Sequence, residues 1–198
     1  MSLAASGVGT TFSSSFYLRK FYKNCSDASK TSKRSKLEPN RLSQADADAL
    51  HKAVKQLRSF KFTDDDNSNL HAGVSALLET YNHTMDSCKD SSDLSVRRYA
   101  KQLKSLVNNH KDELEDIGVT VNKDGTLTAN SNLLKSASVS KIKKLFSKES
   151  EFSTKAFQYS RHLEEKSEEA YKSDIIEQSL KQKEALLTGL GQSVDLSL

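Results

Sequence analysis

Residues 117–146 (IGVTVNKDGTLTANSNLLKSASVSKIKKLF) constrain the fold most, because helical patterning stops there and then resumes. Inside this segment, apolar and polar residues alternate on both sides of the turn sequence Asn-Lys-Asp-Gly. We expect Asp124 and Gly125 to supply the positive φ angles of a tight turn, since glycine has no Cβ to clash. The pattern predicts one small β-hairpin at about 118–129. Its alternating apolar positions are Val119, Val121 and Leu127.

The composition favours helices elsewhere in the chain. A single proline and seven glycines in 198 residues leave long uninterrupted runs, which a many-turned β protein would not have. Hydrophobic residues make up 35% of the chain and tryptophan is absent, which suits a narrow core better than a large spherical one. We therefore expect a mainly α fold: an elongated antiparallel helical bundle with one hairpin and a long C-terminal helix.

Apolar residues recur at three- and four-residue steps after Pro39, which indicates helices with one buried face. Ser43 and Asp46 resemble a capping box near the first helix start. Two further helices follow before the hairpin, the second at roughly 94–115. A short helix after the hairpin is expected to break near 138–140.

The last helix is predicted at about 150–188. Its apolar stripe has heptad-like spacing up to Ala170, and a second run is out of phase by about one residue. A helix this thinly apolar at its end cannot be stable alone, so it leans on a partner or frays. The candidate association surface is Phe152, Tyr159, Leu163, Ala170, Ile176 and Leu180, with intramolecular core as the competing use of Phe152, Tyr159 and Leu163.

The amino-terminal part carries most of the positive charge. Residues 1–41 contain eight Lys or Arg against two acidic residues, whereas the rest of the chain has a net charge of −2. Serine is abundant there, and residues 1–15 lack the pattern of a secretory signal. We predict that residues 1–38 form a disordered, basic, Ser-rich arm, with an aromatic segment at 12–21 that is able to dock, and that residues 39–198 form the helical domain.

No catalytic or ligand-binding motif emerges from the chain. It lacks a phosphate-cradling glycine loop, a GxSxG elbow and an HExxH motif, and its histidines have no metal-ligand spacing. Cys25 and Cys88 define no disulfide framework, and Cys88 falls on an apolar helical stripe. No run approaches the ~18 apolar residues of a membrane-spanning helix. We expect no enzyme, no cofactor, no metal and no small-molecule substrate.

The order of features between residues 70 and 146 resembles the carboxy-terminal helical region of the flagellar filament cap protein family, also called hook-associated protein 2. That family shows an apolar-Tyr-Asn helix end, a helix with paired leucines, an Ile-Gly-Val-Thr strand, Asp-Gly-Thr-Leu, a leucine-containing helix and a closing Leu-Phe. The matching residues here are Leu78-Glu79-Thr80-Tyr81-Asn82, Leu103, Leu106, Ile117-Gly118-Val119-Thr120, Asp124-Gly125-Thr126-Leu127, Leu133-Leu134 and Leu145-Phe146. This chain lacks the family's amino-terminal helices and inserted β domains, and Ala129-Asn130 replaces its usual acidic residue.

The resemblance implies a bacterial, non-enzymatic structural protein that assembles through helix packing, as the axial part of the cap does. It implies self-association or flagellar partners, and secretion by the flagellar type III route. Two alternatives stay open: a cytoplasmic helical adaptor or chaperone-type protein, and a nucleic-acid binder acting through residues 19–41. Counterion release would make that last interaction steeply salt-dependent.

Overall fold

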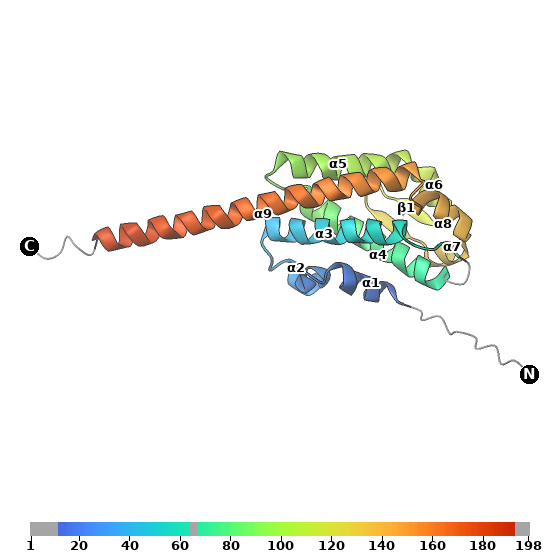
Figure 1. Cartoon of the computed structure of the whole chain (residues 1–198), viewed down its shortest axis with the longest axis horizontal. Coiled ribbons are helices and arrows are strands. Elements are labelled where there is room, and N and C mark those ends of the chain that lie inside the picture. The colour runs from blue at the N-terminus through green and yellow to red at the C-terminus, as the bar shows by residue number, and fades with distance from the viewer. Residues whose placement is uncertain (1–11, 64–66, 193–198) are drawn as a thin grey trace, which may run out of the picture.

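The computed structural model describes residues 12–63 and 67–192, with side chains to residue 188. Its helices pack into an elongated bundle, and one small hairpin interrupts them, so the expected fold class is confirmed (Figure 1). The first half of α9 packs on α3 and α5, and α4 packs on the same two helices. The elements are α1 (Ser14–Phe21), the 3-10 helix η1 (Ser26–Ser29), α2 (Thr31–Arg34), α3 (Pro39–Arg58), α4 (Asn67–Cys88), α5 (Leu94–Asn109), α6 (Lys111–Glu115), β1 (Val119–Val121), β2 (Leu127–Ala129), α7 (Ser131–Ser136), α8 (Val139–Phe146) and α9 (Glu151–Gln192).

Helix α3 is the central element of the bundle and begins at Pro39, where the missing N–H and fixed φ of proline fit a first helical position. Its alanines are almost completely buried, and such small side chains allow α3 to approach closely the helices on which it packs, chiefly α4 and α9. The capping box expected at Ser43 and Asp46 is wrong, because both residues lie inside the helix. Ser43 instead donates its hydroxyl to the Ser87 carbonyl at 2.7 Å, and the Asp46 side chain is buried.

The hairpin has the predicted position and an antiparallel register that pairs Val119 with Ala129 and Val121 with Leu127. Gly125 has a φ of +88°, but no non-glycine residue in the described ranges has a positive φ. The expectation that Asp124 shares this conformation is therefore wrong. Asn122 donates its backbone N–H to the Thr126 carbonyl, which closes a three-residue loop with glycine in its left-handed position.

Helix α4 holds the hairpin through two adjacent side chains. Asn82 donates its amide to the Leu127 carbonyl and accepts from the Leu127 N–H, both at 2.8 Å. Tyr81 donates its hydroxyl to the Gly125 carbonyl at 3.1 Å. Side chains of α4 thus satisfy backbone N–H and C=O groups on the outer edge of the hairpin. Such groups need hydrogen-bond partners when they are buried.

The amino-terminal segment is folded from residue 12 onward, which corrects the expected disordered arm, while the aromatic segment at 12–21 docks on the body as the sequence allowed. Tyr17, Phe21, Tyr22 and Ala28 are buried in the main core, and α1 packs on α3 and α4. The Ser-rich composition suggested that the entropy cost of ordering this segment would prevent its folding. Burial of the aromatic side chains offsets that cost. Residues 1–11 of the predicted arm lie outside the described residues.

The last helix is longer than predicted and leaves the body about halfway along its length (Figure 1). The helix expected at 94–115 is instead divided at His110 into α5 and α6, and the break after the hairpin falls between α7 and α8. No helix in the described part of the chain is long and apolar enough to cross a membrane.

Candidate functional site

The predicted association residues on α9 divide into a buried set and an exposed set. Phe152 and Leu163 are 6% and 0% exposed and belong to the core, so they are not surface anchors. Tyr159 and Ala170 are half-buried against the body. Ile176 and Leu180, in contrast, are 60% and 56% exposed. The apolar residues in the first half of α9 therefore belong to the core of this chain, as the alternative interpretation expected.

The exposed half of α9 carries a concentration of apolar side chains. Of the eight large hydrophobic residues exposed in the described part of the chain, five lie between residues 175 and 187. We call them the distal apolar face. Sequence reasoning missed two of its members, Ile175 and Leu186, because they fall outside the second run of the heptad-like pattern. The face consists of Ile175, Ile176, Leu180, Leu186 and Leu187.

The distal apolar face does not continue the row that packs into the body. At about 100° per residue, Ile176, Leu180 and Leu187 are turned by roughly 110° from the buried row that contains Phe152 and Leu163. This is the one-residue phase change that the sequence showed. A body extended along the buried row would therefore leave Ile176, Leu180 and Leu187 uncovered.

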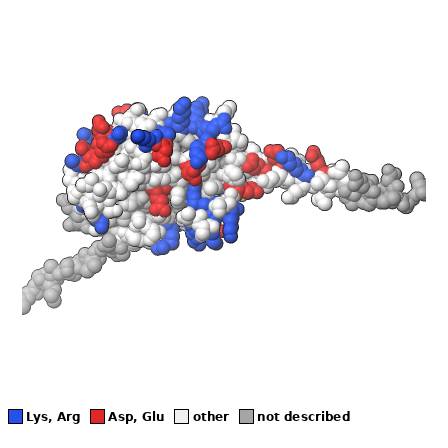
Figure 2. Space-filling model, turned by 180° about the vertical axis from the view of Figure 1, so that it is seen from behind, with Lys and Arg blue, Asp and Glu red and all other residues white. Residues whose placement is uncertain are grey.

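Polar contacts hold α9 against α3 up to the point where the helix leaves the body. Asn40 donates its amide to Asp174 at 2.6 Å, and Arg41 lies 5.1 Å above the ring of Tyr171. Gln178 makes a last, longer contact with Glu38 at 3.4 Å. Beyond it, the recorded side-chain hydrogen bonds and ion pairs, up to Thr188, stay within α9 itself. Figure 2 shows acidic and basic side chains interleaved along this protruding part.

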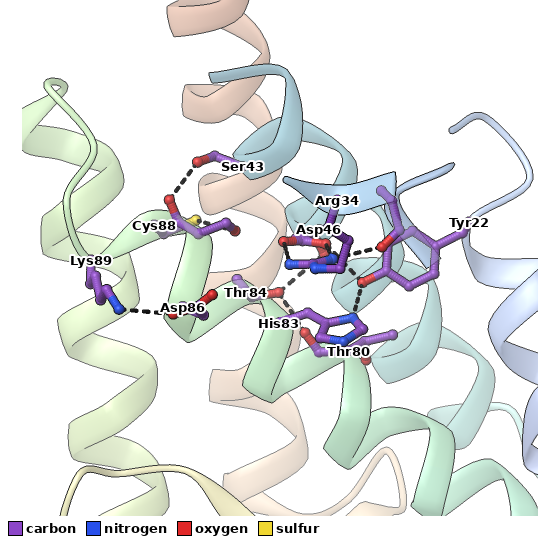
Figure 3. Close-up of polar contacts among 12 residues, drawn as sticks. Tyr22, Arg34, Ser43, Asp46, Thr80, His83, Thr84, Asp86, Cys88 and Lys89 are labelled. Carbon is purple, nitrogen blue, oxygen red and sulfur yellow. Dashed lines mark hydrogen bonds and ion pairs between the residues drawn. The ribbon is translucent and has the colours of Figure 1, made fainter. Parts of the chain in front are cut away.

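A buried polar cluster joins the amino-terminal segment to α3 and α4 (Figure 3). Arg34 donates from both terminal nitrogens to Asp46, and each distance is 2.8 Å. Tyr22 donates its hydroxyl to the same carboxylate at 2.8 Å, so the Nδ1 of His83, 2.9 Å from that hydroxyl, must carry the hydrogen and donate. The Thr84 hydroxyl lies 3.1 Å from the backbone carbonyl of Asp46.

The electrostatics of this cluster favour a structural role over a catalytic one. Burial, followed by the Asp46 charge, raises the pKa of Tyr22, so the phenol stays protonated. Burial alone would lower the pKa of Arg34, but the bonded Asp46 carboxylate outweighs it and raises that pKa. Burial and then the Arg34 charge lower the pKa of His83, so its imidazole stays neutral near pH 7. Both Asp46 oxygens are occupied and the residue is 0% exposed, which leaves no accessible base.

Some basic side chains of the amino-terminal segment are engaged in contacts within the folded protein. Arg34 is buried, Lys33 pairs with Asp27 at 2.9 Å, and Lys20 donates to Gln56 at 2.8 Å. Residues 19–41 are thus folded onto the body instead of forming an extended arm, and nucleic-acid binding by their exposed basic side chains stays a prediction. Within the described ranges, no group of three or more His, Cys, Asp or Glu is placed to hold a metal ion.

No protein-family model matches the chain, and neither does any of the curated proteins or solved structures with which it was compared.

Proposed function

We propose that this chain is a non-enzymatic assembly protein that associates with other protein subunits through the protruding half of α9. The observation that carries the proposal is the distal apolar face: five large apolar side chains on a helix that has already left its own body. A concentration of exposed apolar residues of this kind is typical of protein interaction sites. Their burial against a partner would also stabilise a terminal helix that is marginal alone.

The resemblance to the axial helical part of the flagellar filament cap supports a role in assembly. Two motifs that carry the resemblance, Tyr81-Asn82 and Asp124-Gly125-Thr126-Leu127, contact each other directly through the hydrogen bonds of α4 to the hairpin. Their pairing gives a structural reason for both motifs to occur in one chain. The proposed setting is bacterial, with self-association or flagellar components as partners and with export by the flagellar type III route.

Light scattering over a range of protein concentrations tests the association. The full chain should gain mass with concentration, and the variant Ile176→Gln/Leu180→Gln/Leu187→Gln should remain monomeric. The matched control is Glu177→Gln/Lys181→Gln, which removes an exposed ion pair between the same turns of α9 and should associate like the unaltered chain. A monomeric mass for the full chain at every concentration would contradict self-association.

The alternative is a cytoplasmic adaptor or chaperone-type protein that binds its partner through the same half of α9. The mixture of charged and apolar side chains there suits such a binding surface as well. Immunodetection in sheared filaments and in the cytoplasmic fraction distinguishes the two settings. Recovery with filaments supports the assembly protein, whereas exclusive recovery from the cytoplasm supports the adaptor.

A further inference from the structure

Four lysines converge where α1 lies against α3. Lys20 and Lys23 come from the end of α1 and the turn after it, and Lys52 and Lys55 come from one face of α3. They surround a hollow of about 300 Å³, which we call the lysine hollow. Its remaining lining residues are Phe21, Gln56 and Ser59. The hollow exists only because the amino-terminal segment folds back on α3.

Two of the four ammonium groups are already engaged inside the protein. Lys52 pairs with Asp48 at 2.6 Å, and Lys20 donates to the Gln56 side chain. Lys23 and Lys55 are exposed, and no hydrogen bond or ion pair joins either of them to another described residue. Three positive charges therefore remain after the Asp48 pair is counted, concentrated over a single concave surface.

The field of this cluster reaches the neighbouring helix surface. Burial first, and then the charge of Lys55, lower the pKa of His51, which lies one turn earlier on α3. The Asp48 charge acts on the His51 pKa in the opposite direction. Like charges held together on a folded surface repel one another, and an anion bound between them would relieve that repulsion.

The donor set indicates which anion the site suits. Lysine presents a compact point charge and is a common phosphate ligand, whereas planar carboxylates are recognised best by the forked guanidinium of arginine, which the lining lacks. The volume is at the lower end of small-ligand sites. We propose that the lysine hollow binds a small phosphate-bearing anion, with Lys23 and Lys55 as its main ligands and Lys20 as a third. This binding is independent of the association through α9.

Calorimetric titration of the full chain with sodium pyrophosphate, at constant ionic strength, tests the proposal. The variant Lys23→Gln/Lys55→Gln should weaken pyrophosphate binding about tenfold, because each exposed ion pair contributes a fraction of the binding energy. The control is Lys123→Gln/Lys183→Gln, which removes the same charge from the hairpin turn and from α9. It should bind pyrophosphate like the unaltered chain.

Two further titrations separate this site from general charge attraction. Citrate, a carboxylate anion of similar charge, should bind more weakly than pyrophosphate, and a short single-stranded DNA should bind no more tightly than pyrophosphate. The proposal is overturned by the absence of binding at millimolar pyrophosphate or by equal weakening in both variants. It is equally overturned if citrate matches pyrophosphate, or if DNA binds more tightly with a steep salt dependence, which would indicate a nucleic-acid surface.

Discussion

The guanidinium of Arg34 and the carboxylate of Asp46 face each other in a bidentate ion pair, with both nitrogen–oxygen distances at 2.8 Å and the Asp46 side chain 0% exposed. The pair joins a four-residue helix in the amino-terminal segment to the middle of α3. Tyr22 adds a second bond from the same segment to the same carboxylate. The segment is therefore a docked part of the domain, fastened by one buried acidic side chain.

We expect Arg34→Ala to destabilise the protein by ~3–5 kcal/mol, because it leaves the buried Asp46 charge without its main partner. Urea denaturation followed by circular dichroism measures the change. The nearby Lys33→Ala is the control, since both members of its pair with Asp27 are about half exposed and such pairs contribute only ~0–1 kcal/mol. Similar losses in the two variants would show that the Arg34–Asp46 pair has no special role.

Glu164 is expected to make stability fall as the pH rises. Burial, and then the charge of Asp48, raise the pKa of Glu164 from 4.5 to about 7 in the folded protein. Between these values the folded state holds a proton that the unfolded state has lost, so the free energy of unfolding decreases from about pH 4.5 to about pH 7. The side chain is only half-buried, so the expected change is on the order of 1 kcal/mol after allowance for solvent screening.

The variant Glu164→Gln isolates this effect from that of the neighbouring His51, whose Nε2 lies 3.8 Å from the carboxylate. Burial lowers the pKa of His51, which makes stability fall toward acidic pH and so opposes the Glu164 effect. The measurement is the difference in unfolding free energy between Glu164→Gln and the unaltered chain at pH 5, 6, 7 and 8. The variant should gain in relative stability with rising pH, and a difference that does not vary with pH would refute the assignment.

The sequence predicted the elements whose signals are local. The Asp-Gly turn located the hairpin, and the three- and four-residue spacing of apolar positions located the long helices. It also predicted that the second apolar run on α9 is out of phase, which the structure explains as a face turned away from the body. Ile175 and Leu186 were missed because they lie outside that run.

The aromatic residues at 12–21 indicated a segment able to dock, but the fold of the rest of the amino-terminal segment could not be predicted, because its stabilising contacts are distant in sequence. From the charge distribution alone, Arg34 was expected to be solvent-exposed. From its position near the predicted helix start, Asp46 was expected to cap the helix. Arg34 and Asp46 pair because the chain reverses direction before Pro39, and no turn motif in the sequence indicates that reversal. Phe152 and Leu163 illustrate a related limit, since an apolar stripe does not reveal whether its partner is the same chain or another.

Gly118→Ala should destabilise the protein more than Gly125→Ala. Both glycines have positive φ angles, +80° and +88°, which cost an L-residue ~1–2 kcal/mol. A Cβ at Gly118 would also lie 2.8 Å from the backbone nitrogen of Leu134 in α7, which cannot move aside easily. At Gly125 the Cβ would instead meet the flexible side chain of Lys104. Thermal unfolding of the two variants makes the comparison, and an equal loss would show that α7 yields to the added methyl group.

Cys88 is expected to be inert toward thiol reagents in the folded protein. Its side chain is buried between α3, α4 and α9, and burial raises the pKa of its thiol to about 12, so the reactive thiolate is scarce near pH 7. Cys25 is only partly buried and should react first. Titration of the native chain with Ellman's reagent should therefore give one fast thiol, which Cys25→Ser removes, and a second thiol only in denaturant.

The rate for Cys88 also reports on the attachment of α9. Its thiol should become accessible only when α9 separates from α3, so the slow labelling rate follows opening of that interface. Asn40→Ala removes the bond to Asp174 near the end of this contact and should accelerate labelling, whereas the control Lys181→Ala, on the protruding half, should not. Labelling of Cys88 as fast as that of Cys25 in the unaltered chain would mean that α9 does not stay packed on the body in solution.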